Sequence, residues 1–238
     1  MTSNRESLLI IGGTSGIGLY AAQKLSSQYR VFVAGRRKLE KMDGVELIQL
    51  DVQEESSVQS CFCYLSKQLK GLSALVYSAG VTVPKAPITE FSKSDWERVM
   101  NINVVGAILS LKYAFPLLKQ EKGRVVLINS IAGRTYSQLS GYLYTISKSA
   151  MSGLARQIAA EWAEYGILVN SLYPSMTKTP MLEENVEKEV LQEVEAAIPI
   201  KRIALQEEVS SAIEFLISPK NSYMTGCGLD INGGQYFN

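Results

Sequence analysis

Tyr144 and Lys148 are the residues whose types and spacing point most directly to proton transfer. They lie four residues apart in a segment with helical spacing, so their side chains are expected on one face of a helix. A neighbouring ammonium favours the phenolate, so Lys148 is expected to lower the pKa of Tyr144 and make its hydroxyl a better acid near neutral pH. Tyr20 and Lys24 share this spacing, but no polar cluster accompanies them, and Tyr20 is interpreted as a packed or half-exposed aromatic residue.

The composition excludes several other kinds of chemistry. The 238 residues include no histidine, so Ser-His-Asp and Cys-His arrangements and most zinc sites cannot be built. Cys61 and Cys63 fall in a helical stretch on different faces, with too few further ligands for a metal site. The net charge of +1 provides no general attraction to nucleic acid or to an anionic membrane.

Cysteine content and hydropathy predict the compartment. The chain has only 3 cysteines, an odd number that indicates thiols in a reducing compartment rather than a disulfide framework. No apolar stretch reaches the roughly 18 to 20 residues that a bilayer span needs, and the N-terminus does not resemble a signal peptide. A cytoplasmic protein with no membrane and no nucleic-acid partner is therefore expected.

Short apolar runs alternate with helical patterns along the whole length. The runs are continuous rather than alternating, as is typical of strands buried on both faces of a parallel sheet. The predicted strands cover residues 8–11, 31–33, 46–50, 74–77, 124–128 and 168–172. Because no repeat or Pro/Gly-rich linker interrupts the alternation, we expect one α/β domain over 1–238 with helices on both faces of the sheet.

A glycine-rich run follows the first predicted strand and precedes a helical pattern over 19–25. Glycines in this place form a phosphate site, because backbone N–H groups and the helix dipole face the anion and no Cβ atoms block it. An ordinary tight turn is the alternative, and the position after the first strand favours the phosphate site. The run consists of Gly12, Gly13, Thr14, Ser15, Gly16, Ile17 and Gly18.

The ends of the second and third strands bear on the choice of nucleotide. Arg36 and Arg37 stand where a carboxylate would bind the ribose 2′-hydroxyl of NAD, and two guanidiniums can instead hold a 2′-phosphate. This favours NADP over NAD, unless both arginines are solvated surface charges. Asp51, followed by Val52, could meet the adenine amino group, or it could form a capping box with Glu54.

Ser130 falls just after the predicted strand 124–128. Doubly wound sheets bind their ligands at the carboxyl ends of the strands, so Ser130 is expected near any ligand that Tyr144 meets. A strand-end cap is the alternative interpretation of the serine.

These motifs together resemble the single-domain short-chain dehydrogenases/reductases, and the resemblance covers essentially the whole chain. The glycine motif of that family corresponds to residues 11–18, its Tyr-x-x-x-Lys to Tyr144 and Lys148, its serine to Ser130 and its helical asparagine to Asn103. Four places depart from the pattern. They are Ile11 for a threonine, Tyr77-Ser78 for two asparagines before Ala79-Gly80, Ser175 for a glycine, and Asn232 for an aspartate.

The resemblance implies a Rossmann fold with a doubly wound sheet of about seven strands, and it assigns roles to the residues. Ser130 would hydrogen-bond a carbonyl oxygen, Tyr144 would deliver the proton, and Lys148 would bind the nicotinamide ribose. Asn103 would hold its helix open around a water, or it could simply be a helix-interior residue bonded to backbone. The implied cofactor contacts are Gly12, Thr14, Ser15, Gly16, Ile17, Gly18, Arg36, Arg37, Asp51, Val52, Ser78, Ala79, Gly80, Tyr144, Lys148, Pro174, Thr177 and Thr179.

The expected activity is NADPH-dependent hydride transfer between the nicotinamide and a ketone or secondary alcohol, with a 3-oxoacyl group or another apolar carbonyl compound as a possible substrate. The alternative is a dinucleotide-binding regulator without turnover.

Residues 178–200, with an acidic helical segment over 183–197, are interpreted as a substrate lid. Small residues along the Tyr144 helix, from Ala150 to Ala163, suit close helix contact, and the family implies a homodimer or homotetramer.

Overall fold

The structure is a computed structural model, and it describes residues 5–37, 41–179, 182 and 188–237. Its centre is a 7-stranded sheet with the order β3-β2-β1-β4-β5-β6-β7, in which every neighbouring pair is parallel. The strands are β1 (Ser7–Ile11), β2 (Arg30–Gly35), β3 (Val45–Gln49), β4 (Ala74–Tyr77), β5 (Arg124–Ile128), β6 (Leu168–Pro174) and β7 (Gly228–Ile231). The predicted doubly wound parallel sheet is confirmed.

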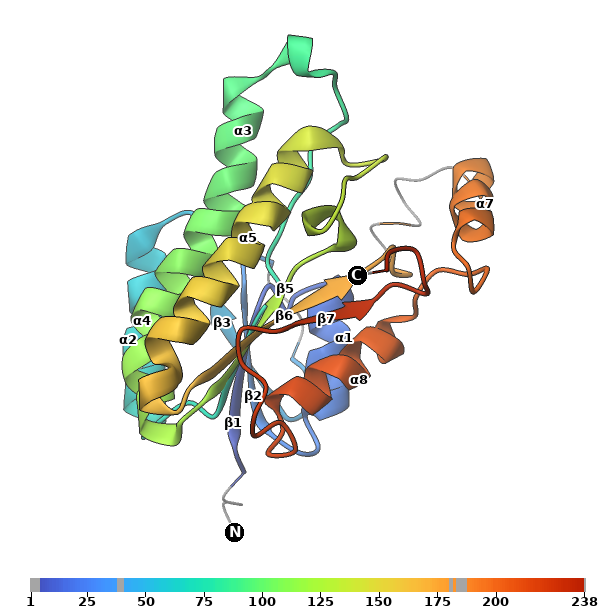
Figure 1. Cartoon of the computed structure of the whole chain (residues 1–238). Helices are drawn as coiled ribbons and strands as arrows, with labels where there is room; N and C mark the ends of the chain where they lie inside the picture. The colour runs from blue at the N-terminus through green and yellow to red at the C-terminus, as the bar shows by residue number, and fades with distance from the viewer. Residues whose placement is uncertain (1–4, 38–40, 180–181, 183–187, 238) are drawn as a thin grey trace.

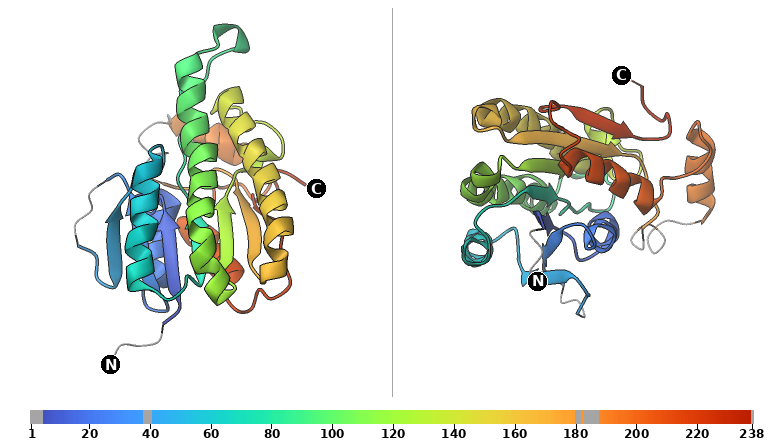
Figure 2. Two further views of the ribbon diagram at one scale, coloured as in Figure 1. Left: turned by 90° about the vertical axis from the view of Figure 1, so that its left-hand side faces the viewer. Right: turned by 90° about the horizontal axis from the view of Figure 1, so that it is seen from below.

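Helices cover both faces of this sheet (Figures 1 and 2). One face carries α1 (Gly16–Leu25) and α8 (Gln206–Ile217). The other face carries α2 (Glu55–Gln68), α4 (Gly106–Glu121) and α5 (Gly141–Trp162), which form a row in the right-hand view of Figure 2. Because both faces are covered, the strands had to be apolar on both sides.

The residues of β1 show how one strand serves two cores. Leu9 and Ile11 pack with α2, α4 and α5, whereas Leu8 and Ile10 pack with α1 and α8. All four side chains are fully buried. Successive side chains of a strand point to opposite faces, so a continuous apolar run fills both cores at once.

One long helical stretch contains a change of helix type. α3 (Lys93–Met100) continues through η2, a π-helical turn (Asn101–Val105), into α4. The stretch Lys93–Glu121 is 29 residues long and is apolar enough to cross a membrane by length and composition alone, which the sequence analysis did not expect. Within the fold, 56% of the most apolar 18 residues of this stretch is buried, and core helices of globular domains can be equally long and apolar.

Most of the shorter elements lie near the carboxyl edge of the sheet. α3 projects beyond this edge, and α7 (Lys188–Ala197) lies to the right of the sheet (Figure 1). Single turns are η1 (Ile88–Glu90), η3 (Ile131–Gly133) and η4 (Ala163–Tyr165). Of the segment predicted as a helix over 183–197, α7 forms the later part, and residues 183–187 lie outside the described residues.

One local prediction from the sequence was wrong. The capping box of Asp51 with Glu54 does not form, because the N-cap of α2 is Glu54 itself, three residues after Asp51.

The small residues of α5, which are expected to suit close helix contact, are not equally accessible. Ala155 and Ala159 are buried against the sheet, whereas Ala160 is exposed, so the helix turns them to different surroundings.

Candidate active site

The glycine-rich loop between β1 and α1 is fixed from both neighbouring strands. The N–H of Gly12 donates to the carbonyl of Ala34 on β2 over 2.8 Å, and the N–H of Ser78 after β4 donates to the carbonyl of Ile11 over 2.8 Å. Gly12 has φ +83°, and a Cβ atom there would overlap the backbone of Ala79. Only glycine combines this backbone conformation with so close an approach.

The start of α1 suits an anionic ligand. Ser15 is the N-cap residue, its side chain makes no capping hydrogen bond among the described residues, and the first turn carries no acidic side chain. The first N–H groups of the helix therefore keep their capacity to donate to a phosphate. Thr179, from the segment after β6, comes close to this loop, since its Cγ2 lies 3.6 Å from the place of a Cβ on Gly16. These residues fit the pyrophosphate of a dinucleotide.

The predicted nucleotide-selecting residues lie at the next strand ends. Thr14 packs its side chain on Gly35 at the end of β2, directly before Arg36. Arg36 and Arg37 are exposed, and the carbonyl of Arg36 accepts a 3.0 Å hydrogen bond from Gln49. Neither guanidinium is enclosed by the fold, so both are accessible to a ligand at this edge.

Asp51 and Val52 follow β3 and have structural partners. Asp51 accepts from the N–H of Gln53 through Oδ1 over 3.1 Å, and its own N–H donates to Ser57 Oγ over 3.0 Å. Val52 is buried at 7% exposure. Asp51 therefore shapes the turn before α2, in a way that differs from the predicted capping box.

Ser130 follows β5 and begins the η3 turn. Its Oγ accepts from the N–H of Ala132 over 3.1 Å, so the serine caps this turn, as the alternative interpretation proposed. The same side chain lies close enough to the phenol of Tyr144 to lower its pKa. The turn packs tightly on α5, because a Cβ on Gly133 would lie 2.8 Å from the carbonyl oxygen of Lys148. Local capping and this close packing together fix the hydroxyl beside Tyr144.

Lys148 shares a face of α5 with Tyr144, as the spacing predicted. Its Nζ lies 5.5 Å from the centroid of the Tyr144 ring and donates to the carbonyl of Ile128 at the end of β5 over 2.9 Å. The residue is 5% exposed, and burial lowers the pKa of its ammonium to about 8. Desolvation disfavours the charged form, so this lysine releases its proton more readily than one on the surface.

The pKa of Tyr144 moves opposite to the expectation. Burial raises it above the ordinary value of 10.0, and the hydrogen bond with Ser130 counteracts this only in part. Without a dinucleotide, the desolvation of the phenol outweighs any stabilisation of its phenolate. Tyr144 therefore holds its proton at neutral pH, and Ser130 rather than Lys148 is the neighbour that lowers its pKa.

Asn103 occupies the π-helical turn and connects three segments. Its Oδ1 accepts from the N–H of Val81 over 2.8 Å, and its Nδ2 donates to the carbonyl of Val81 over 3.0 Å and to Ser147 Oγ over 2.9 Å. Ser147 in turn donates to the carbonyl of Tyr144 over 2.8 Å. These contacts with Val81 agree with the alternative interpretation of an asparagine bonded to backbone, and the helix changes to a π turn at this residue.

Gly80 and the segment after β6 complete the site. A Cβ on Gly80 would lie 3.5 Å from Asn103 Oδ1 and 3.6 Å from Lys148 Nζ, so this residue borders both polar groups. Pro174 ends β6 and is buried, and Thr177 is buried with its hydroxyl donating to the carbonyl of Ser175 over 3.1 Å. The predicted site residues thus follow the carboxyl ends of β1, β2, β3, β4, β5 and β6 or lie on the helices packed there.

This arrangement can hold and move a proton at one oxygen. The Ser130 hydroxyl lies close to the Tyr144 phenol, so both can hydrogen-bond the same substrate oxygen, and Tyr144 carries a proton to give it. A bound nicotinamide dinucleotide would supply or accept a hydride. Lys148 places a positive charge below pH 8 beside the phenol, where it favours the phenolate left after proton transfer.

Comparisons with known proteins agree with this geometry. The family model described as enoyl-(acyl carrier protein) reductase matches residues 12–235. The chain belongs to the short-chain dehydrogenase/reductase family. Members of this family are oxidoreductases that act on alcohol and carbonyl groups and use NAD or NADP.

Three similar proteins illustrate the range of this family. The 3-oxoacyl-[acyl-carrier-protein] reductase FabG of Aquifex aeolicus is 30% identical over 96% of each chain. The structure of ElxO with NADP bound has a TM-score of 0.90 and 27% identity over 97% of this chain and 98% of its own. A short-chain dehydrogenase from Leptospira borgpetersenii with bound NAD+ also has a TM-score of 0.90, with 25% identity over 98% and 93%.

Several residues of this oxidoreductase were not identified from the sequence. Ser147 and Asn129 hold the catalytic segments through side-chain hydrogen bonds, and Tyr77 hydrogen-bonds the π turn beside Asn103. Arg134 joins the η3 turn to β7. Ser147 lies between Tyr144 and Lys148 in sequence, which is a usable signal. Nothing in the pattern of Arg134 indicated a partner almost one hundred residues away.

Proposed function

We propose that the protein is an NADPH-dependent reductase that transfers hydride between the nicotinamide and a ketone or secondary alcohol. The observation that carries the proposal is the closeness of the Ser130 hydroxyl to the Tyr144 phenol, with the buried amine of Lys148 5.5 Å from the centroid of the Tyr144 ring. In the reducing direction, Ser130 donates a hydrogen bond to the carbonyl oxygen and Tyr144 gives its proton to the forming alkoxide. Lys148 binds the nicotinamide ribose and favours the phenolate that Tyr144 becomes.

The preference for NADP over NAD rests on Arg36 and Arg37. Both are exposed at the end of β2, where the ribose of the adenosine half is bound in dinucleotide folds. A guanidinium can hold a phosphate with two parallel hydrogen bonds, and NAD offers no phosphate at this position. One solved relative contains NADP and another contains NAD+, so the choice depends on these side chains of the chain itself.

The substrate is an apolar carbonyl compound in this proposal, with residues 178–200 as the lid. Ile198 is fully buried, and the N–H of Ile200 donates to the carbonyl of Gly233 over 3.3 Å, so the end of the segment is fixed against the C-terminal turn. Met181 and Val186, two further apolar residues of this segment, lie outside the described residues. A 3-oxoacyl thioester is one candidate, as the name of the Aquifex aeolicus relative suggests.

The test is a screen of ketones and acyl thioesters with NADPH oxidation as the readout, followed by Tyr144→Phe. With the best substrate, the variant should lose about two to four orders of magnitude in kcat, because a positioned general acid contributes that much. Its affinity for NADPH should stay within about twofold, measured by fluorescence titration.

Two outcomes would overturn the proposal. Full activity in Tyr144→Phe would mean that the phenol does not transfer the proton. Tight NADPH binding without turnover of any substrate in the screen, in either direction, would favour the alternative of a dinucleotide-binding regulator. Asn103→Asp, which keeps the size of the side chain, would then serve to ask whether binding alone depends on the π turn.

A further inference from the structure

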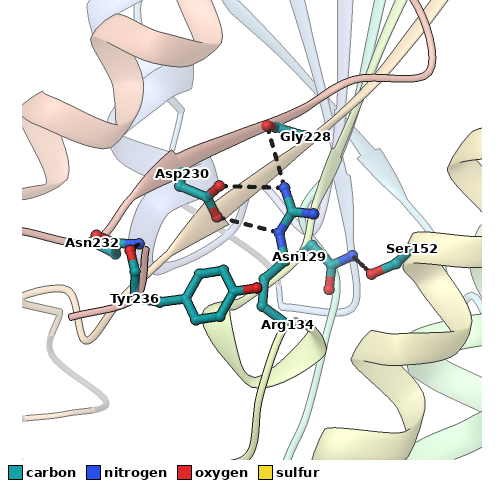
Figure 3. Close-up of polar contacts among 7 residues, drawn as sticks. All are labelled: Asn129, Arg134, Ser152, Gly228, Asp230, Asn232 and Tyr236. Carbon is teal, nitrogen blue, oxygen red and sulfur yellow. Dashed lines mark hydrogen bonds and ion pairs between the residues drawn. The ribbon is translucent and has the colours of Figure 1, made fainter. Parts of the chain in front are cut away.

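Arg134 directly follows the η3 turn that Ser130 begins. Figure 3 shows its guanidinium extending from this turn to β7. Its Nε donates to Asp230 Oδ1 and its Nη2 to Asp230 Oδ2, each over 3.3 Å, and Nη2 also reaches the carbonyl of Gly228 over 3.3 Å. The Arg134 side chain thus binds two residues of β7, Gly228 and Asp230.

The pair is enclosed enough for its attraction to matter. The side chains of Arg134 and Asp230 are 22% and 19% exposed, and the guanidinium lies 3.9 Å from the centroid of the Tyr173 ring on β6. Arginine can bind a carboxylate through two N–H groups and at the same time stack its planar guanidinium on an aromatic ring. Lysine cannot do both. Partial burial also reduces screening by salt.

Backbone hydrogen bonds carry this anchor to the catalytic serine. The N–H of Arg134 donates to the carbonyl of Ile131 over 2.9 Å, and the N–H of Gly133 donates to the carbonyl of Ser130 over 2.9 Å. Because Ser130 Oγ accepts from Ala132 within the same turn, a movement of Arg134 would shift the serine hydroxyl.

The other end of the turn is held from α5. Asn129 Oδ1 accepts from the N–H of Ser130 over 3.1 Å, and Asn129 Nδ2 donates to Ser152 Oγ over 3.0 Å (Figure 3). Ser152 is one helical turn beyond Lys148 and donates to its carbonyl over 3.0 Å. The serine turn is therefore fixed on one side to the helix of Tyr144 and Lys148, and on the other side through Arg134 to β7.

We propose that Arg134 and Asp230 are positioning residues, which set the orientation of Ser130 by tying its turn to β7. This inference rests on the proposed function for its kinetic consequence. The structural consequence, a turn that becomes mobile when the pair is broken, does not depend on any activity. Asp230 thus links the C-terminal strand to the reaction, although it does not reach the reacting atoms itself.

The kinetic test uses Arg134→Met and Asp230→Asn with the carbonyl substrate found in the screen. Each variant should lower kcat about tenfold, because a misplaced hydrogen-bond donor weakens the stabilisation of the transition state. KM for NADPH should stay unchanged, because the glycine-rich loop is not touched. Arg134→Lys, which keeps the charge, should recover part of the loss.

A double variant separates positioning from general damage. If Arg134 acts through Ser130, adding Arg134→Met to Ser130→Ala should lower kcat no further than Ser130→Ala alone. A further tenfold loss in the double variant would show that Arg134 acts independently of the serine. That result would overturn the proposal.

Arg30→Met is the matched control. Arg30 also pairs with a carboxylate, Glu46, at 2.8 Å, and its guanidinium lies 4.9 Å from the centroid of an aromatic ring, Phe32. This pair joins β2 to β3, and β1 and β4 lie between β2 and the β5 strand that leads to Ser130. Its loss should leave kcat within about twofold.

Hydrogen exchange provides the readout that needs no activity. In Arg134→Met and Asp230→Asn, amides 131–135 should exchange at least about tenfold faster, while amides of the glycine-rich loop keep their rates. Unchanged exchange at 131–135 would overturn the inference even in an active enzyme. Faster exchange in a protein without turnover would support the anchor and contradict the proposed function, so the two failures are distinguishable.

Discussion

The phenol of Tyr77 donates a 2.6 Å hydrogen bond to the carbonyl oxygen of Ile102, inside the π turn that presents Asn103. Tyr77 ends β4 and is only 1% exposed, and it stands where the family usually has an asparagine. A carbonyl that accepts a hydrogen bond from a side chain does not need a regular backbone N–H donor from the helix. This suits a turn where the α-helix changes to a π-helix.

Tyr77→Phe should therefore destabilise the protein, although the ring still fills the core. The carbonyl of Ile102 would lose this buried partner, and we expect a loss of about 1–3 kcal/mol in the free energy of unfolding. Urea denaturation measures the loss. Tyr64→Phe on α2 is the control, because Tyr64 is 43% exposed and its hydroxyl can use water. An equal, small effect for both variants would mean that the hydroxyl of Tyr77 contributes nothing to the turn.

Lys148 gives a prediction about pH. Its pKa is about 8 in the folded chain and 10.5 without burial, so between these values the unfolded chain holds a proton that the folded chain has released. The free energy of unfolding therefore rises with pH between 8 and 10.5. Below pH 8 the buried ammonium lowers the free energy of unfolding by about 3 kcal/mol.

Lys148→Met removes this titration. At pH 7 the variant should be more stable than the wild type, because it carries no buried charge, although it also loses the hydrogen bond to Ile128. The difference in the free energy of unfolding should become smaller as pH rises from 8 to 10.5. Thermal unfolding of both proteins without cofactor at several pH values tests this. A stability difference that does not change with pH would mean that the pKa of Lys148 is not lowered.

Arg36→Ala tests the choice of nucleotide. Loss of a guanidinium that binds a phosphate should weaken NADPH binding about ten- to a hundredfold, as is usual for hydrogen bonds between charged groups, and should change NADH binding little. Lys67→Ala on the exposed side of α2 removes the same charge elsewhere and should alter neither affinity. Equal losses for NADPH and NADH in Arg36→Ala would contradict the assignment of the 2′-phosphate.

The sequence predicted the sheet well because its signal is local. A strand buried on both faces must be apolar at every position, and β4 and β5 begin and end where the apolar runs at 74–77 and 124–128 do. The position of Ser130 followed from the parallel sheet, since residues after parallel strands gather at one edge. The shared face of Tyr144 and Lys148 followed from their helical spacing.

Features that depend on the folded surroundings were not predicted. The pKa of Tyr144 is set by how deeply the phenol is buried, and the Tyr-x-x-x-Lys spacing says nothing of burial. Arg134 and Asp230 form a pair across 96 positions, and Tyr77 meets the π turn only because β4 runs beneath it. The short boundary error at Asp51 arose because several turn geometries satisfy the same Asp-x-x-Glu spacing.

The glycine-rich loop has one more consequence, which concerns the thermodynamics of binding. Its backbone is already bonded to Ala34 on one side and joined to β4 through Ile11 and Ser78 on the other. The loop therefore has little conformational entropy left to lose when a ligand arrives, and its shape exists before the encounter. Recognition of the phosphates is rigid docking onto a preformed cradle, so the affinity that this loop contributes is not reduced by a cost of ordering.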